Sequence, residues 1–108
     1  MKRIQKRLNY LLAETWLSKN DVKEEYREEL LSIVEKVFDF VEEYGKIRGK
    51  IKLGLKDLDE IDKLRKKFFD FYHTIMFQTN FREDPYLSTI LKKLFEDAKK
   101  ILDKPLFS

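Results

Sequence analysis

The stretch YREELLSIVEKVFDFVEEY, residues 26–44, decides the fold that we expect for this chain. Its apolar residues recur at alternating intervals of four and three positions, which is the spacing of a heptad seam along one side of a helix. These seam residues are Tyr26, Leu30, Ile33, Val37, Phe40 and Tyr44. A second apolar stripe of Leu31, Val34, Phe38 and Val41 runs beside the seam. A helix that is apolar over so much of its girth lies centrally or faces a second subunit.

The boundaries of this helix follow from its flanking residues. We expect Asp21 to cap its start, with Glu24 at the reciprocal third position, and Gly45 to end it. Upstream, the periodic apolar residues of 2–18 predict a first helix. Downstream, DLDE predicts a third helix that Asp57 caps and that ends near residues 78–80. Its expected seam consists of Ile61, Leu64, Phe68, Phe71 and Ile75.

A fourth helix is predicted from DPYL, where Asp84 caps and Pro85 takes the first helical position. Its apolar stripe ends before Pro105 and consists of Leu87, Ile90, Leu91, Leu94, Ala98, Ile101 and Leu102. Four helices with short connections predict an all-α fold, a mostly antiparallel four-helix bundle that forms one domain over residues 1–108. The longest expected connection, residues 45–56 between the second and third helices, is basic and contains all three glycines.

Composition narrows the class of protein. Hydrophobic residues make up 43% of the 108 residues, which is enough for a globular core, and charged residues make up 40%. The chain has no cysteine, so disulfides, thiolate metal sites and a cysteine nucleophile are excluded. No apolar run approaches the roughly 18 residues that span a bilayer, and the amphipathic start is unlike a signal peptide. We therefore expect a cytoplasmic protein without a membrane role. Abundant Lys and Glu with few Gln and Asn are typical of thermophiles, although an AT-rich genome also favours Lys.

The block FFDFYHTIMFQTNF, residues 68–81, contains five of the nine phenylalanines and the single histidine. Helical spacing places Phe68 at the centre of a buried face and His73 on the outer face, three residues after Asp70. We interpret the block as core and the Asp70–His73 pair as a surface ion pair. Phe69 and Phe77 are expected to form a small exposed apolar patch that a partner protein could contact.

The chain contains no complete motif for catalysis. EEYRE, residues 24–28, resembles the first half of the carboxylate motif of MazG-type nucleotide pyrophosphohydrolases, but the Glu-x-x-Asp that these enzymes also need occurs nowhere. A lone histidine builds no metal site without further ligands, and no glycine-rich phosphate loop is present. We therefore expect a non-enzymatic protein with no metal and no cofactor.

Basic residues concentrate in two segments. MKRIQKR contains Lys2, Arg3, Lys6 and Arg7, and the expected connection contains Lys46, Arg48, Lys50, Lys52 and Lys56. Together these two segments carry nine positive charges, whereas the whole chain has a net charge of +3. Segregated positive charge indicates a polyanion as ligand, whereas a merely solvated surface is the alternative. Glycines within the second segment would let its backbone approach such a ligand closely.

A small, cysteine-free, all-helical chain with the basic stretches MKRIQKR and KIRGKIKLGLK resembles the helical small subunits of CRISPR RNA-guided effector complexes. The resemblance covers size, class and these two stretches. It implies a non-catalytic role in which Lys and Arg line a nucleic-acid groove and copies of the subunit stack as a filament.

Two functions remain open from the sequence. The first is a helical bundle that binds RNA or single-stranded DNA through its backbone, as a subunit of a larger assembly. The second is a protein–protein interaction or oligomerisation module, such as a small archaeal virus or plasmid protein, with no nucleic-acid role. The first requires the two basic segments to lie on one side of the fold. The second requires Leu31, Val34, Phe38 and Val41 to form a continuous exposed strip.

Overall fold

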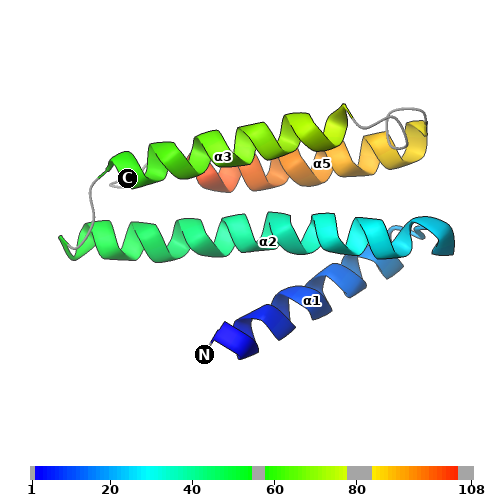
Figure 1. Ribbon diagram of the computed structural model, residues 1–108, viewed down its shortest axis with the longest axis horizontal. Helices are drawn as coiled ribbons and strands as arrows, with labels where there is room; N and C mark the ends of the chain where they lie inside the picture. Colours follow the sequence, from blue (N-terminus) through cyan, green and yellow to red (C-terminus); the bar gives the residue numbers. More distant parts are fainter. Residues whose placement is uncertain (1, 55–57, 78–83, 105–108) are drawn as a thin grey trace. The chain divides into compact units, whose positions relative to one another are not determined.

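A computed structural model describes residues 2–54, 58–77 and 84–104 of the chain, with side chains from Asn9 onward. Its elements in chain order are α1 (Lys2–Lys19), α2 (Glu24–Lys52), α3 (Asp59–Met76) and α5 (Pro85–Leu102) (Figure 1). All four are helices, and the described ranges contain no strand. The predicted all-α class is therefore confirmed.

The chain divides into two compact units, Met1–Asp39 and Phe40–Ser108. The first unit contains α1 and the beginning of α2, and the second contains the end of α2 together with α3 and α5. Within the first unit, the side-chain amide of Asn9 in α1 donates a hydrogen bond to the carboxylate of Asp39 in α2. The sequence-based expectation of one domain over residues 1–108 stays a prediction.

The turn between α1 and α2 differs from the predicted cap. Asp21 has a left-handed backbone with a φ of 50°, and the Val22 N–H donates back to the Leu17 carbonyl at 3.2 Å. These features define a Schellman ending of α1, so Asp21 ends the first helix instead of capping the second. The side-chain amide of Asn20 also donates to the carbonyl of Trp16, at 2.9 Å. Leu17, three residues before Asn20, is completely buried, so the turn is held by packing as well as by hydrogen bonds.

The expected end of α2 at Gly45 is wrong, because the helix continues through Gly45 and Gly49 to Lys52. The heptad seam explains the continuation, since the next seam position after Tyr44 is Ile47 and both side chains are buried. A glycine inside a helix costs about 0.5–1 kcal/mol relative to alanine, and burying an isoleucine contributes more than that. The chain leaves the helix at Gly54, whose φ of 75° suits glycine. The basic connection predicted for residues 45–56 is therefore mostly helix.

The helices α3 and α5 follow their predicted patterns closely. The carboxylate of Asp84 accepts hydrogen bonds from the Tyr86 and Leu87 N–H groups, and Pro85 occupies the first turn, so the predicted cap of α5 is confirmed. In α3, Leu58 stands at the N-cap position and makes no side-chain cap. The predicted cap Asp57 lies outside the described residues, as do residues 78–80 and Pro105. The buried residues of the two helices are Ile61, Leu64, Phe68 and Ile75, and Leu87, Leu91, Leu94, Phe95, Ala98 and Leu102.

An aromatic cluster forms the centre of the second unit. The ring of Phe95 in α5 lies 5.8 Å from the rings of Phe68 and Phe71 in α3, measured between centroids. Phe40 in α2 contacts the same two α3 rings, at 5.4 and 5.7 Å. Edge-to-face and tilted arrangements at these distances are favourable. This cluster holds α3 and α5 side by side (Figure 1), and Phe40 joins α2 to α3.

Two hydrogen bonds reach the carboxyl end of α5. The guanidinium Nε of Arg65 in α3 donates to the Leu102 carbonyl at 2.7 Å, and the Tyr44 hydroxyl in α2 donates to the Lys104 carbonyl at 2.8 Å. The last carbonyls of a helix have no partner within the helix, so Arg65 satisfies one of them, and Tyr44 bonds to the carbonyl of Lys104 just beyond α5. Within the described ranges, no helix combines the length and apolarity needed to cross a bilayer.

Candidate nucleic-acid interface

The last turns of α2 carry four of the five cations predicted for the second basic segment. Lys46 and Lys50 are four residues apart, as are Arg48 and Lys52, so helix geometry arranges them as two rows on different flanks. Cations near a helix C-terminus interact favourably with the helix dipole, and no acid lies between Gly45 and Gly54. Lys56 lies outside the described residues. The structure therefore shows a basic helix end over most of the segment that the sequence predicted to be a basic connection.

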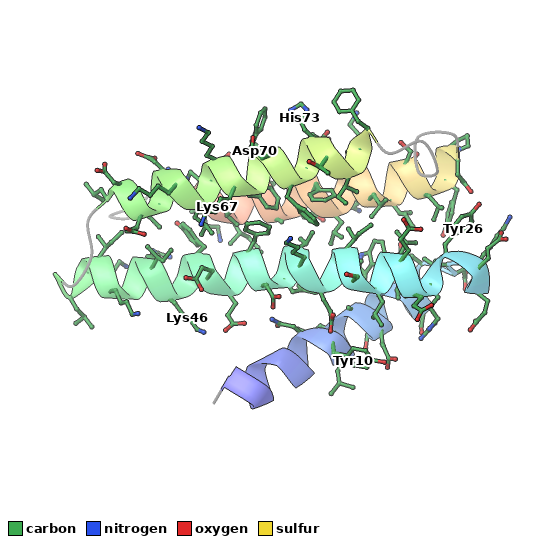
Figure 2. The ribbon with its side chains drawn as sticks, in the orientation of Figure 1. Tyr10, Tyr26, Lys46, Lys67, Asp70 and His73 are labelled. Carbon is green, nitrogen blue, oxygen red and sulfur yellow. The ribbon has the colours of Figure 1, made fainter. Side chains whose placement is uncertain are left out.

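The four cations have different surroundings. The ammonium of Lys46 forms an ion pair with Glu42 at 2.8 Å, and Figure 2 shows Lys46 on the outer side of α2. The Nε of Arg48 is buried and has no hydrogen-bond partner among the described residues. Lys50 and Lys52 are exposed to solvent. Lys50 and Lys52, which lie on opposite flanks of α2, are therefore the two of these four cations that are best placed to meet a ligand.

The other predicted basic cluster lies in the first unit. Lys2, Arg3, Lys6 and Arg7 fall in the first two turns of α1, where only the backbone is described. The structure assigns them to Met1–Asp39 and the α2 cations to Phe40–Ser108. Counted over the sequence, the second unit has 15 Lys and Arg against 12 Asp and Glu, whereas the first has eight of each. The net positive charge of the protein therefore belongs entirely to the second unit.

A groove of about 480 Å³ lies on one flank of the α3–α5 pair. Its floor is aromatic and apolar, and charged side chains from both helices line its rim. The floor consists of Phe68, Phe69, Tyr72, Phe95 and Leu102, and the rim consists of Arg65, Lys66, Glu96, Lys99 and Asp103. Arg65 is held in place by its bond to the Leu102 carbonyl and by its ion contacts with Asp62 and Asp103, at 3.7 and 3.8 Å. We call this feature the α3–α5 groove.

An aromatic row continues from the groove over α3. His73 lies between Phe69 and Phe77, with ring centroids at 4.3 and 5.7 Å, and the Phe77 ring is stacked on the imidazole. Figure 2 shows His73 on the outer side of α3. Phe69 is 55% exposed and Phe77 is 66% exposed. We call these three residues the aromatic row. Phe69 belongs both to this row and to the floor of the groove.

The surface ion pair expected between Asp70 and His73 is absent from the described part of the chain. The imidazole instead contacts the rings of Phe69, Phe77 and Tyr72, the last at 5.5 Å. Residues three and four apart on a helix are both neighbours, so Asp70 and the two phenylalanines are all within reach of His73, and the imidazole is in contact with the rings. Nothing in these contacts resembles a general-base arrangement. The described residues also contain no group of three or more His, Asp or Glu side chains suited to a metal ion.

The predicted partner strip on α2 is not a continuous exposed surface. Val34 has no exposed area, and its neighbours Leu31, Phe38 and Val41 are half-buried. The four residues form no such surface because other residues of the same chain already cover the second apolar stripe of α2. The exposed apolar residues of the first unit lie instead on α1, where Leu11 is 48% and Leu12 is 51% exposed. Beside them, Glu14 accepts a hydrogen bond that raises the pKa of Tyr10 above its usual value.

The groove was not predicted from the sequence, although the sequence does indicate which residues share a flank of each helix. Helical spacing places Phe69 and Tyr72 on one flank of α3, and it places Phe95 and Lys99 on one flank of α5. Their convergence depends on how α3 and α5 are paired, which one sequence does not specify.

A comparison with protein families, with curated proteins and with solved structures finds no match for this chain.

Proposed function

We propose that this protein is a non-enzymatic helical module that binds the backbone of RNA or single-stranded DNA, as a subunit of a larger nucleoprotein assembly. The observation that carries the proposal is the end of α2, where four cations lie within seven residues and no acid intervenes. Apart from the neighbouring backbone of α2 itself, no atom of the described residues lies within 4 Å of a Cβ built on Gly49, so the backbone between the two rows of cations is open to an approaching phosphate.

The proposed contact is electrostatic and independent of base sequence. Each Lys or Arg that neutralises a phosphate releases condensed counterions, so affinity falls with salt in proportion to the number of contacts. Exposed lysines on a helix position the backbone of a nucleic acid but do not read base edges. The resemblance to helical CRISPR small subunits supports the same role. It also implies that neighbouring copies would extend the contact along the strand.

Reversing the two exposed cations of α2 tests this proposal. We expect Lys50→Glu with Lys52→Glu to weaken binding to a labelled single-stranded oligonucleotide severalfold at about 50 mM salt. Losing two phosphate contacts should also reduce the slope of log affinity against log salt by about 1–2. The matched control is Lys19→Glu with Lys23→Glu, which makes the same charge change in the first unit. Fluorescence anisotropy measures both quantities, and melting curves show whether each variant is folded.

Two outcomes would contradict the proposal. The wild-type protein could show no binding to RNA or single-stranded DNA at tens of micromolar protein and low salt. Alternatively, the control variant could weaken binding as much as the α2 variant does. In the latter case the effect would come from overall charge and not from the end of α2.

We also propose that the four helices form a mostly antiparallel bundle. Three contacts support this arrangement. Arg65 near the start of α3 bonds to Leu102 at the end of α5, and Tyr44 near the end of α2 bonds to Lys104 just beyond α5. In the first unit, Asn9 in α1 bonds to Asp39 in α2 across the tight turn between these helices.

Self-association is the second candidate function, and the exposed apolar residues of α1 favour it. Leu11 and Leu12 present about half of their surface to solvent, and adjacent exposed leucines are candidates for a contact with another chain. We expect light scattering at micromolar concentration to give at least twice the chain mass of 13.2 kDa. Leu11→Glu with Leu12→Glu should return the mass to that of one chain, whereas the control Leu53→Glu, at the exposed residue just after α2, should not. A wild-type mass of one chain at every concentration would exclude this candidate.

A further inference from the structure

We infer that the α3–α5 groove and the adjoining aromatic row bind unpaired bases by stacking, which makes the protein selective for single strands over duplexes. This inference rests on the proposed function. It adds a second contact to the backbone contact of α2, with a different chemistry and on different helices. Charged rows alone do not distinguish a single strand from a duplex, because both present phosphates. A surface that accepts base faces does distinguish them, because the bases of a duplex are already stacked.

The groove has the size and composition of a ligand site. Its volume of about 480 Å³ lies within the roughly 300–1,000 Å³ of small-molecule pockets. Its floor is aromatic, and the Tyr72 ring is fixed there by an edge contact with Phe95 at 5.1 Å. The Phe69 ring stands at the edge of the floor with more than half of its surface exposed. A flat ring that is exposed on one side and held from below by packed neighbours is suited to stacking.

The charge on the rim favours a ligand that combines aromatic rings with negative charge. Lys66 comes from α3 and Lys99 from α5, and both side chains are exposed. Of the two acids on the rim, Asp103 lies 3.8 Å from the Nε of Arg65, which offsets part of its charge. The two lysines on neighbouring helices can therefore neutralise phosphates on either side of a base that enters the groove. An aromatic floor beside basic side chains is the combination found in sites that bind single-stranded nucleic acid.

The aromatic row extends this surface beyond one base. Phe69, His73 and Phe77 recur every four residues of α3, and the His73 ring centroid lies 4.3 Å from that of Phe69 and 5.7 Å from that of Phe77, so the three rings form one continuous aromatic surface. Phe77 is exposed at the far end of the row. A second base can therefore stack on the exposed Phe77 ring while the first base enters the groove beside Phe69.

The test compares three ligands of equal length: a single strand, the matching duplex, and an abasic single strand that keeps the phosphates but lacks bases. We expect Phe69→Ala with Phe77→Ala to weaken binding to the single strand about tenfold or more, since losing the stacking on one aromatic side chain typically costs about fivefold or more and this variant loses two. Binding to the duplex and to the abasic strand should be unchanged. The matched control is Tyr86→Ala, which removes an exposed aromatic residue of α5 that does not line the groove.

The outcomes separate this inference from the function on which it rests. A loss confined to the single strand, with an unchanged melting temperature, supports base stacking. An equal loss on all three ligands, or no loss on any, overturns the stacking site and leaves the backbone contact of α2 in place. Equal wild-type affinity for the single strand and the abasic strand overturns it as well. If none of the three ligands binds to the wild-type protein, both the proposed function and this inference fail.

Discussion

Replacing Phe95 by alanine is expected to lower the free energy of unfolding by about 3–5 kcal/mol. Phe95 is 1% exposed, and its ring lies between 5.1 and 5.8 Å from those of Phe68, Phe71 and Tyr72. Truncation removes these contacts and leaves a cavity that the surrounding helices cannot fully close. Since a domain of this size is stable by only about 5–15 kcal/mol, a large share of its stability should be lost. Urea denaturation followed by circular dichroism measures the change.

Phe77→Ala is the matched control for this experiment. It removes the same ring from a position that is 66% exposed and that contacts only His73 among the ring contacts of the described residues. We expect a change within about 0.5 kcal/mol, as for most surface substitutions. A loss below about 1 kcal/mol for Phe95→Ala would mean that the aromatic cluster does not hold α3 and α5 together.

Replacing Gly45 and Gly49 together by alanine is expected to raise the free energy of unfolding by about 1–2 kcal/mol. Both glycines lie inside α2, and no atom lies within 4 Å of a Cβ built on either. Alanine therefore fits without strain and reduces the conformational freedom of the unfolded chain. For a domain of about 100 residues, 1 kcal/mol corresponds to a shift in Tm of roughly 4–8 °C. Thermal melting is thus sensitive enough to detect the gain.

Gly54→Ala should have the opposite sign, because the φ of 75° at this position is unfavourable for a residue with a Cβ. We expect a loss of about 1–2 kcal/mol. A gain in stability at Gly45 and Gly49 together with a loss at Gly54 would place the end of α2 between Gly49 and Gly54. If the double substitution at Gly45 and Gly49 had no effect or were destabilising, the segment would not be helical in solution.

The helices were predictable because their apolar periodicity is strong and uninterrupted. The seam of α3 and the stripe of α5 agree with the buried residues apart from half-buried Phe71 and Ile90 and the more exposed Ile101. The predicted stripe of α5 also omitted Phe95, which is 1% exposed. The helix ends at Asp21 and Gly45 were predicted wrongly, because a capping residue and a helix-stopping glycine are recognised by local preference alone. At Gly45 the burial of Ile47 in tertiary structure outweighs that preference. Asp21 stands two residues before Lys23, the position that precedes α2, and its backbone ends α1 instead.

The candidate site was predictable only where it lies on one helix. The cations of α2 follow from the sequence, although the sequence suggested a loop and the structure places them in two helical rows. The exposure of Phe69 and Phe77 follows from their position on the α3 helix. The α3–α5 groove does not follow, because it requires the flank of Phe69 and Tyr72 to meet that of Phe95 and Lys99. The contact between these two flanks depends on long-range packing, and the spacing of residues within one helix does not reveal it.

The position of Trp16 gives the two units separate optical signals. It is the only tryptophan in the chain, and it lies in α1, within the first unit. The cluster around Phe95 lies wholly in the second unit and contains phenylalanine and tyrosine only. Indole fluorescence therefore follows the unfolding of the first unit, and the phenylalanine bands of the near-ultraviolet dichroism follow chiefly that of the second, since eight of the nine phenylalanines lie there. Coincident transitions would mean that both units unfold as one cooperative domain.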